Sequence, residues 1–469
     1  MEARKRFMYF DMTKLSNPPM PNYTFSIYNR DLFEKSKFKN YDSLLKSRFA
    51  RDQARANHLA WILVNGNMIG TNETLTRTHG RHENKRDGEE VLAKTDTYAT
   101  GKGEYVASFT LGYQKIKSFL IIDTGSDLTW WQCGPCVPNG CYEQVNDPLY
   151  VEIDNHSFGR INCTAEPQYC DTSRRNFICD PRERGDTCSY DYTYEDGGRT
   201  KGWLASDTIT FDLDGVFTWI IFGCGKDQTS GTPFDGAYSG LVGLGRRVMQ
   251  GRGYSLPSQF GADIMAICLP TIASTEPSTI TFFETPFTTE ISAGLVPNSR
   301  FPFFYYVNFY KIFINDQEVP FDPSYWNFRD DLSGGCMVDT GTTISRFPRV
   351  YYNLFRDIFR QQVRDFPRYE GPLSGPYDTC YTVADLSQEP IFPVVKMYFG
   401  TQNPNNLLLL SQHRVVVPTG AGNGIATLCL AFLPWDESDA IIGSYQLQGI
   451  GLTFDTAANT LSFNLDACQ

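Results

Sequence analysis

The stretch Phe119–Cys133 has the sequence Phe-Leu-Ile-Ile-Asp-Thr-Gly-Ser-Asp-Leu-Thr-Trp-Trp-Gln-Cys, in which an apolar run ends abruptly on an acidic residue. That residue is Asp123, and the following Thr124 and Gly125 suit a tight turn at the end of a strand. The sequence therefore predicts that the Asp123 carboxylate lies in a buried loop directly after a core strand.

The same pattern recurs far downstream, where Cys336–Thr343 has the sequence Cys-Met-Val-Asp-Thr-Gly-Thr-Thr. Its Asp339 follows Asp123 by 216 residues. One copy alone fits an Asx-type turn that closes a strand. Two copies, each behind an apolar run and each followed by Ser or Thr, favour two related halves that each contribute one aspartate.

Length and composition predict an all-β body. The 469 residues suffice for two or three domains with a large core. The chain is rich in Gly, Tyr and Phe, and turn signals interrupt it roughly every ten residues. Because no window approaches roughly eighteen apolar residues, we expect a soluble protein with no membrane partner.

Charge divides the chain into a basic head and an acidic body. Residues 1–95 hold 17 Lys and Arg against 11 Asp and Glu, a net charge of +6, which leaves −17 for the remainder. An acidic body argues against nucleic-acid binding. It suits a protein that works at low pH, where protonated surface carboxylates no longer repel one another.

Seven of the 13 cysteines lie between Cys133 and Cys188, in a loop-rich stretch without an obvious core of its own. Disulfides would stabilise such a segment. Zinc is the alternative because Cys133 and Cys136 have ligand spacing, but no second Cys-x-x-Cys and no His-x-x-x-His follow. We therefore expect disulfides and no metal.

Disulfides require an oxidising compartment, and the sequons at Asn155 and Asn162 predict a glycoprotein that passes through one. A signal peptide is not visible, since Met1–Lys14 contains only the short apolar run Phe7–Phe10. Either the start of the chain is incomplete or wrongly assigned, or the inferred compartment is wrong.

The basic head predicts a removable pro-segment. Residues 1–35 look irregular, residues 41–64 have the apolar spacing of a basic amphipathic helix, and residues 65–90 resemble an exposed linker suited to proteolysis. We expect cleavage between about Lys85 and Glu104. In this interpretation the cations of the head lie against acidic catalytic groups; a merely solvated basic helix is the alternative.

Three further patterns lie in the body. Ser189–Gly198 alternates aromatic and polar residues before a Gly-Gly turn, which predicts a β-hairpin able to fold over a cleft, or else an ordinary surface hairpin. Gly240–Gly245 and Ala440–Gly443 share an apolar-apolar-Gly pattern typical of buried strands that approach other backbone closely. Val350–Val363 has the spacing of an amphipathic helix.

With two Asp-Thr-Gly loops, an aromatic hairpin between them and an apolar-apolar-Gly motif late in each half, the chain resembles the pepsin-like aspartic proteases. The crowded cysteines, together with Phe222–Gly225, Gly243–Arg246, Leu256–Gln259 and Asp378–Tyr381, resemble the nepenthesin-type plant branch of that family. The similarity extends from about residue 104 to residue 468.

The resemblance implies an all-β, bilobal fold with two pseudo-twofold related β lobes, a few short helices and a partly helical pro-segment in front of them. The implied domains are the pro-segment over residues 1–98, an N-terminal lobe over 99–275 and a C-terminal lobe over 276–469. It also implies a substrate cleft between the lobes, a monomer, and a secreted or vacuolar location.

The resemblance further implies that Asp123 and Asp339 form a catalytic dyad. Neighbouring motif residues would support it: Thr124 and Thr340 would brace the two loops, Gly125 and Gly341 would offer backbone amides, and Ser126 and Thr342 would hydrogen-bond the outer carboxylate oxygens.

The aromatic hairpin is implied to be a flap over the cleft, with Tyr194 as the flap tyrosine and Trp130 as its indole partner. The family's flap usually has the sequence Tyr-Gly-Asp-Gly-Ser or a close variant. This chain has Glu195 and Asp196 after the tyrosine, which places an extra carboxylate near the substrate and leaves the specificity and pH optimum open.

The implied activity is that of an aspartic endopeptidase made as a zymogen, acting on protein or peptide substrates at acidic pH without a cofactor or metal. Two carboxyls about 3 Å apart cannot both ionise, so they share one proton. The ionised member takes a proton from the attacking water, and the protonated member stabilises the oxyanion.

Two rival hypotheses remain. The first is a catalytically silent binding protein on the same fold, resembling the plant xylanase inhibitors, although relatives of that kind tend to lose catalytic-loop residues and both Asp-Thr-Gly motifs are complete here. The second is a cysteine peptidase that uses Cys336, the cysteine in excess of the branch's usual twelve. It lacks support because no His lies in a recognisable partner motif.

Overall fold

The computed structural model describes residues 23–29 and 105–468, apart from short segments. These segments are 145–147, 153–156, 173–175, 181–185, 194–198, 211–216, 229–237, 247–253, 272–273, 275–277, 290, 372–374, 385–389, 423–424 and 466. The predicted basic helix, the linker, the sequon at Asn155 and the hairpin tip with Tyr194, Glu195 and Asp196 lie outside the described residues.

In the first half of the chain, four strands surround the first Asp-Thr-Gly loop. Strand β3 (Ile116–Asp123) pairs in parallel with β11 (Gly240–Gly243), and Asp123 lies opposite Gly243. Strand β4 (Trp130–Gly134) runs antiparallel to β11 and parallel to β10 (Phe217–Asp227). The chain therefore leaves β3 at Asp123, turns, and returns along the other side of β11.

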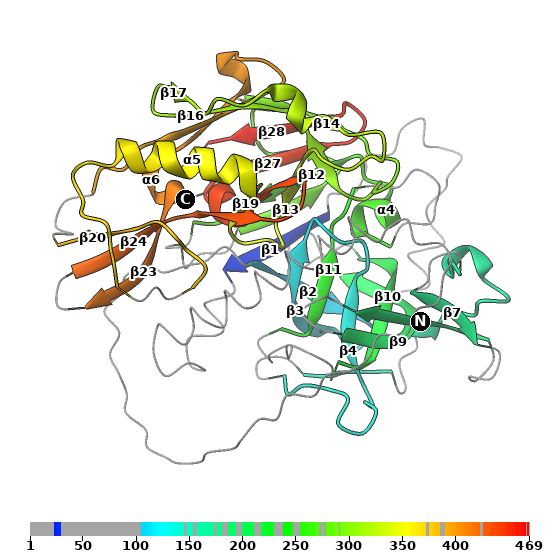
Figure 1. The fold of residues 1–469 in the computed structure, drawn as a ribbon. Helices are drawn as coiled ribbons and strands as arrows, with labels where there is room; N and C mark the ends of the chain where they lie inside the picture. The colour runs from blue at the N-terminus through cyan, green and yellow to red at the C-terminus, as the bar shows by residue number, and fades with distance from the viewer. Residues whose placement is uncertain are drawn as a thin grey trace, which may run out of the picture.

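The second half repeats this arrangement pair by pair. Strand β18 (Cys336–Asp339) is parallel to β26 (Ala440–Gly443), with Asp339 opposite Gly443. Strand β19 (Ser345–Pro348) is antiparallel to β26 and parallel to β25 (Phe432–Trp435). The repeat predicted from the two Asp-Thr-Gly motifs and the two apolar-apolar-Gly motifs is thus a repeat of strand pairing. Figure 1 shows the first-half strands on one side of the molecule and the second-half strands β16 to β24 with α5 on the other.

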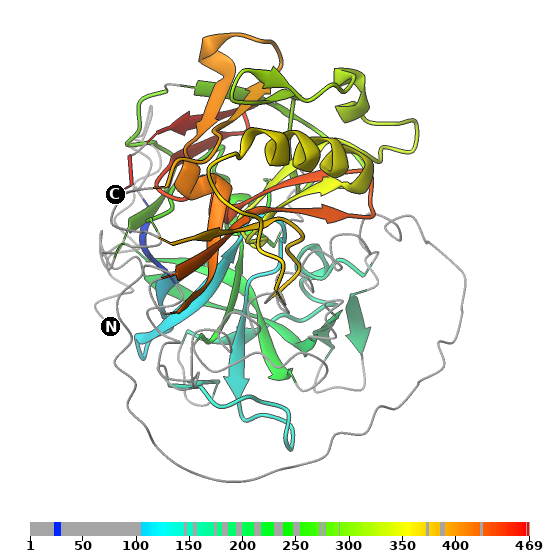
Figure 2. The same cartoon turned by 60° about the vertical axis from the view of Figure 1, so that its left-hand side comes forward.

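A sheet formed by segments from both ends of the chain connects the two halves (Figure 2). Its ladders run from β14 to β28, β27, β12, β13, β1 and β2, every adjacent pair being antiparallel. The bounds are β1 (Tyr23–Asn29), β2 (Tyr105–Leu111), β12 (Ile264–Cys268), β13 (Ser278–Phe282), β14 (Ile291–Val296), β27 (Gly451–Asp455) and β28 (Thr460–Asn464). The predicted boundary at residues 275 and 276 falls between the paired strands β12 and β13; the division into domains remains a prediction.

Strand β1 corrects the expectation that residues 1–35 are irregular. Tyr23 lies opposite Phe282 of β13, and Asn29 lies opposite Tyr105 of β2. The segment Tyr-Thr-Phe-Ser-Ile-Tyr-Asn alternates large apolar with small or polar residues, which is the period of a strand. The predicted pro-segment therefore includes a strand paired with the body of the protein.

The remaining strands complete the two halves. In the first half, β9 runs between β8 and β10, and β7 and β6 pair with β8 and β9. The bounds are β5 (Tyr150–Val151), β6 (Gly159–Arg160), β7 (Phe177–Asp180), β8 (Thr187–Thr193), β9 (Arg199–Thr210), β15 (Tyr305–Val307), β16 (Phe309–Ile314), β17 (Gln317–Glu318), β20 (Cys380–Val383), β21 (Val395–Phe399), β22 (Leu407–Leu410), β23 (Val416–Gly422) and β24 (Ile425–Leu430).

Among the described residues the helices are few and mostly short, as expected for this fold. They are α4 (Leu256–Phe260), α5 (Arg349–Gln362), α6 (Gln412–Val415) and α7 (Ser444–Leu447), with 3-10 turns at Pro167–Tyr169, Pro323–Trp326 and Pro404–Asn406. None of the helices in the described part of the chain has the length and apolar character needed to cross a membrane.

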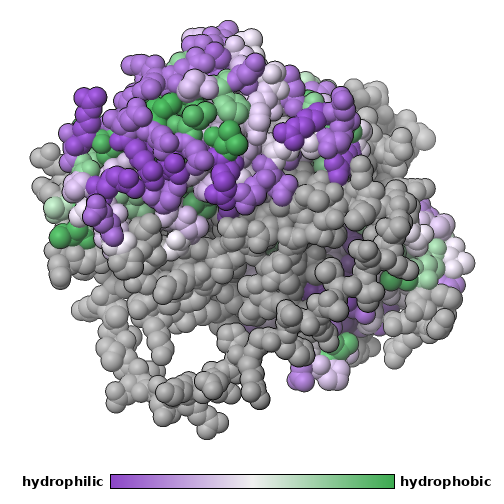
Figure 3. Space-filling model, in the orientation of Figure 1, coloured by the Kyte–Doolittle hydropathy of each residue, from purple (hydrophilic) through white to green (hydrophobic). Residues whose placement is uncertain are grey.

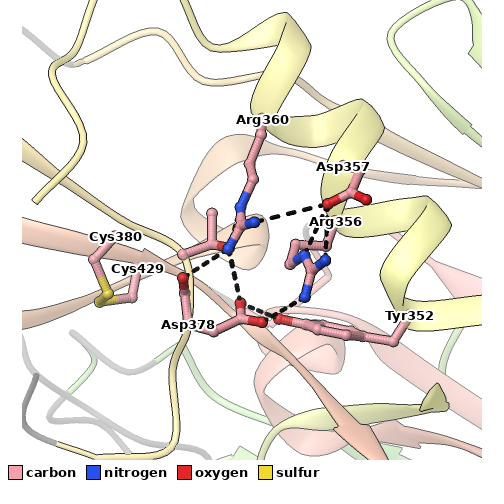
Figure 4. A network of polar contacts seen from close by, with 8 residues as sticks. Tyr352, Arg356, Asp357, Arg360, Asp378, Cys380 and Cys429 are labelled. Atoms are coloured by element: carbon pink, nitrogen blue, oxygen red, sulfur yellow. Dashed lines mark hydrogen bonds and ion pairs between the residues drawn. A yellow bond between two sulfur atoms is a disulfide. The ribbon is translucent and has the colours of Figure 1, made fainter. Parts of the chain in front are cut away.

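The helix predicted over residues 350–363 is confirmed as α5. Its apolar side, which includes Tyr351, Phe355 and Phe359, is buried against the core of the second half. Its other side carries arginines that bond the segment before β20 (Figure 4). On the face drawn in Figure 3 the described part of the second half is mostly hydrophilic, with smaller apolar spots.

All 13 cysteines are accounted for by six disulfides and one buried free thiol. The disulfides are Cys133–Cys224, Cys136–Cys141, Cys163–Cys179, Cys170–Cys188, Cys268–Cys468 and Cys380–Cys429. The zinc hypothesis is wrong for Cys133 and Cys136, because each is bonded to a different cysteine. No group of three or more metal-binding side chains occurs within the described segments.

Candidate active site

The two aspartates lie at the ends of equivalent strands, β3 and β18, and both side chains are buried. Asp123 is 1% exposed and Asp339 is fully buried. Both carboxylates approach Gly341: a Cβ atom at this position would lie 2.5 Å from Oδ1 of Asp123 and 3.2 Å from Oδ1 of Asp339. The inner oxygens therefore face one point, and glycine leaves the space that they occupy.

Backbone amides bind the inner oxygens in a symmetric pattern. The amide of Gly125 donates to Oδ1 of Asp123 at 2.9 Å, and the amide of Gly341 donates to Oδ1 of Asp339 at 2.9 Å. Each bond closes a turn directly after a strand, as the Asp-Thr-Gly sequence predicts. These donors favour the ionised form of a carboxyl, since hydrogen bonds to an anion stabilise its charge.

The outer oxygens differ between the two halves. Thr342 donates from Oγ1 to Oδ2 of Asp339 at 2.6 Å. Ser126 is buried, but its hydroxyl bonds no described residue, so the expected bond to Asp123 is absent from this structure. The carbonyl of Ser126 accepts from the amide of Gly245, which fixes its backbone while the hydroxyl remains free to rotate.

The threonines of the two motifs connect the loops. The amide of Thr124 donates to Oγ1 of Thr340 at 3.2 Å, and the amide of Thr340 donates to Oγ1 of Thr124 at 2.9 Å. These bonds satisfy two buried amides and join segments 216 residues apart. The structure thus brings together all of the Asp, Thr and Gly residues that the two motifs singled out.

Glycines of β11 and β26 allow close approach of the loops. A Cβ atom at Gly243 would lie 2.5 Å from the backbone of Asp127, and one at Gly443 would lie 2.5 Å from the carbonyl oxygen of Thr343. Both amides are held by hydroxyls that sequence analysis missed: Gly243 donates to Oγ1 of Thr129 at 3.1 Å, and Gly443 to Oγ of Ser345 at 2.9 Å. Thr129 and Ser345 each lie six residues after an aspartate, and this equivalent spacing could have indicated their shared role.

Trp130 is fully buried in β4 beside the first loop. Its expected partner Tyr194 lies outside the described residues, so the flap roles of Tyr194, Glu195 and Asp196 remain predictions. The base of the hairpin is described: β8 pairs with β9, and Arg199 of β9 forms an ion pair with Asp191 of β8.

One contact at the hairpin base was not foreseen from the sequence. The hydroxyl of Tyr192 in β8 donates to Oδ1 of Asp127 at 3.1 Å. Asp127 is the fourth residue after Asp123 and is buried. The hairpin and the first Asp-Thr-Gly loop are therefore joined by a hydrogen bond between side chains.

The cysteine-rich stretch packs against this same region. Cys163, Cys170 and Cys188 lie in an apolar cluster that also contains Leu128 from the first loop and Tyr190 from β8. Two disulfides, Cys163–Cys179 and Cys170–Cys188, cross-link the stretch that builds this cluster. The insertion without a core of its own thus shares a small core with the hairpin and the loop.

A third buried carboxyl lies next to β26, the strand that pairs with β18. Asp439 directly precedes β26, is 1% exposed, and has an Oδ1 atom with no hydrogen-bond partner among the described residues. Burial raises its pKa to about 7, against a weaker lowering effect of the Ser438 hydroxyl. Glu437 raises this pKa further and Arg329 lowers it.

Cys336 opens β18 and is the free thiol predicted from the count of cysteines. Its side chain is fully buried, and burial raises the pKa of the thiol far above its usual value. A buried, protonated thiol is a poor nucleophile. The position argues against the cysteine peptidase hypothesis.

Comparison with known proteins agrees with this geometry. A family model described as Xylanase inhibitor N-terminal matches residues 105–282, and one described as Xylanase inhibitor C-terminal matches residues 304–465. The crystal structures of edgp and of Basic 7S globulin from soybean share the fold, with TM-scores of 0.59 and 0.55 at 18% identity. Each alignment covers 77% of this chain and 91% of the chain in the compared crystal structure.

Curated relatives are named as proteases. Aspartic proteinase nepenthesin-1 of Nepenthes gracilis is 31% identical, over 80% of this chain and 80% of its own length. Protein ASPARTIC PROTEASE IN GUARD CELL 2 of Arabidopsis thaliana is 29% identical, over 98% of this chain and 90% of its own length. The chain therefore belongs to the plant, nepenthesin-type branch of the pepsin-like aspartic protease family.

Proposed function

We propose that the protein is an aspartic endopeptidase that hydrolyses peptide bonds of protein or peptide substrates at acidic pH, with Asp123 and Asp339 as its catalytic dyad. The observation that carries the proposal is the approach of both inner carboxylate oxygens to one point beside Gly341. Two carboxyls in this arrangement share a proton and titrate as a coupled pair. One is then available as a base and the other as an acid.

The chemistry follows from this division. The ionised carboxylate takes a proton from a water molecule as that water attacks the scissile carbonyl carbon. The protonated carboxyl donates a hydrogen bond to the developing oxyanion, and its proton later reaches the leaving amine. The amides of Gly125 and Gly341 and the hydroxyl of Thr342 hold the carboxylates in place during these transfers.

Synthesis as a zymogen is part of the proposal. The head is basic while the rest of the chain is strongly acidic, so the two attract each other at neutral pH. Strand β1 of this head pairs with β2 and β13 of the body. Acidification weakens the attraction by protonating carboxylates, which would favour release and cleavage of the head.

The compartment is inferred from the cysteines. Six disulfides indicate folding in an oxidising environment, which fits an extracellular or vacuolar protein. Glycosylation stays a prediction: the partly buried Asn162 forms a β-bridge with Thr187 just before a turn, and its Oδ1 accepts from the amides of Thr164 and Ala165.

A second function is kept because both matching family models are described as Xylanase inhibitor. In this alternative the chain is a catalytically silent protein that binds another protein through the same fold. The complete pair of Asp-Thr-Gly loops, joined by the reciprocal bonds of Thr124 and Thr340, favours the protease.

The test compares wild type with Asp123→Asn and Asp339→Asn, all expressed under oxidising conditions, acidified and given a denatured protein substrate. Wild type should cleave the substrate, and each variant should lose at least about a thousandfold in kcat/KM. The matched control is Asp316→Asn, because Asp316 has a side chain 96% exposed on the surface and should not affect cleavage. Equal cleavage by wild type and both dyad variants would eliminate the protease; no cleavage together with inhibition of a xylanase would favour the alternative.

A further inference from the structure

Asp127 is held in a fixed position close to the first catalytic aspartate. Its backbone packs on Gly243, where a Cβ atom would come within 2.5 Å of it. The residues on both sides are also fixed, since Ser126 accepts a backbone bond from Gly245 and Leu128 is buried in an apolar cluster. The Asp127 side chain itself is only 3% exposed. A shift of this carboxylate therefore moves the loop that begins at Asp123.

Tyr192 is held equally well on the other side of the contact. It lies opposite Thr200 in the β8–β9 ladder, and its ring meets the ring of Phe177 at a centroid distance of 6.3 Å. The ion pair of Asp191 with Arg199 links the two residue pairs that flank Tyr192 and Thr200 in this ladder. The position of the Tyr192 hydroxyl is thus coupled to the position of the whole hairpin base.

The bond between them joins two segments that the chemistry needs in a fixed relation. The Tyr192 hydroxyl donates to the buried Asp127 side chain at 3.1 Å. The carboxylate stands four residues from Asp123, and the hairpin is the element expected to cover the substrate. Rigid support of this kind matters because small displacements of the reacting groups strongly lower the rate of the reaction.

We propose that Tyr192 and Asp127 are positioning residues for the hydrolysis, because their hydrogen bond fixes the base of the β8–β9 hairpin against the first catalytic loop. The inference rests on the proposed endopeptidase function. It also assigns a role to the disulfide-linked insertion, whose cysteines build the cluster in which Leu128 and Tyr192 pack.

The test is a comparison of Tyr192→Phe with Tyr254→Phe. Both changes remove a tyrosine hydroxyl next to Phe177, whose ring lies 4.6 Å from that of Tyr254. The hydroxyl of Tyr254 bonds the backbone of Asp171 and Tyr169, which lie in the cysteine-rich stretch. A purely structural role of the cluster would affect both variants alike.

We expect Tyr192→Phe to lower kcat/KM about tenfold, with KM raised and kcat lowered together, as for other changes at the base of a covering element. Tyr254→Phe should stay within about twofold of wild type in both constants. Asp127→Asn keeps an acceptor oxygen and should retain more activity than Asp127→Ala. The double variant of Tyr192→Phe with Asp127→Ala should lose less than the product of the single losses.

Hydrogen exchange supplies a readout that does not need activity. In Tyr192→Phe, amides in residues 124–131 and in β8 should exchange faster than in wild type, while Tyr254→Phe leaves residues 124–131 unchanged. Unchanged exchange in the loop of Tyr192→Phe, or a lower kcat at constant KM, would overturn the inference. Absence of Asp123-dependent cleavage in wild type would instead overturn the proposed function, and the exchange result would still decide whether the bond couples hairpin and loop.

Discussion

Thr124 and Thr340 hydrogen-bond each other reciprocally, each amide donating to the other residue's Oγ1. The hydroxyl of Thr124 donates in turn to the carbonyl of Val338 at 3.4 Å, and that of Thr340 donates to the carbonyl of Ile122 at 3.5 Å. Each threonine thus contacts the strand that carries the opposite aspartate. The relative position of the two carboxylates depends on four bonds between the halves of the chain.

Replacing either threonine by valine tests this dependence. Thr124→Val leaves the buried amide of Thr340 without an acceptor, which should cost about 1–3 kcal/mol in the free energy of unfolding. Thr340→Val should cost a similar amount. Because both changes act on one network, the double variant should be less destabilised than the sum. Urea unfolding measures all three, with exposed Thr289→Val as the control; additive costs would contradict a shared network.

The sequence predicted the repeat because its signal is local. Each aspartate follows an apolar strand and precedes Thr-Gly, and the strand that supports it ends in the apolar-apolar-Gly motif. The pairing that sets Asp123 opposite Gly243 and Asp339 opposite Gly443 was not predicted and comes from the structure. The helix over residues 350–363 was also visible in its apolar spacing.

What the sequence did not predict depends on contacts between distant segments. Strand β1 has the alternation of a strand, but the sequence analysis interpreted its region from the basic charge alone. Its pairing partners are 76 or more residues away in the chain. The bond of Tyr192 to Asp127 spans 65 residues and leaves no mark in either local pattern. The Ser126 hydroxyl lacks the bond that the equivalent Thr342 hydroxyl makes, and the local pattern does not distinguish the two positions.

Asp439 predicts that stability falls as the pH rises. Its folded-state pKa of about 7 lies above the value of 3.8 expected when unfolded, so its contribution is fully present below pH 3.8 and is lost between pH 3.8 and 7. The loss corresponds to about 4 kcal/mol. Asp439→Asn, which stays neutral, should flatten this part of the profile in urea unfolding between pH 3 and 8.

The control for Asp439 is Asp436→Asn. Asp436 is 77% exposed in its side chain, and its pKa is lowered by the hydrogen bond from Arg349, so this change should not flatten the decline above pH 4. If Asp439→Asn and wild type lose the same free energy of unfolding as the pH rises, Asp439 is not the cause of this loss. Higher stability at low pH fits the proposed hydrolysis at acidic pH.

Asp378 predicts the opposite dependence at lower pH. Burial alone would raise its pKa, but hydrogen bonds from Tyr352, Thr379 and Arg356 outweigh burial and lower it (Figure 4). Its stabilising effect is therefore present above its unfolded pKa and is lost as the pH falls through the lower folded value. Asp378→Asn should reduce the melting temperature more at pH 6 than at pH 2. Asp316→Asn, at an exposed ion pair, should show a smaller difference, and an equal one would contradict this assignment.

Cys336 predicts one thiol that reacts only after unfolding. The side chain is fully buried, and the other 12 cysteines are disulfide-bonded. A thiol reagent should therefore label no thiol in the native protein and one per chain in denaturant, whereas Cys336→Ala should give none in either state. Cys336→Ser should lower the free energy of unfolding by about 1–3 kcal/mol relative to wild type, because it buries a hydroxyl in place of a weakly polar thiol.

Two labelling results would contradict this assignment. Labelling of the native protein would show that β18 opens beside Asp339. Two or more reactive thiols in denaturant would contradict the disulfide assignment. Unchanged cleavage by Cys336→Ala would confirm that the thiol takes no part in the reaction, since a nucleophile cannot be replaced by a methyl group without loss of its covalent step.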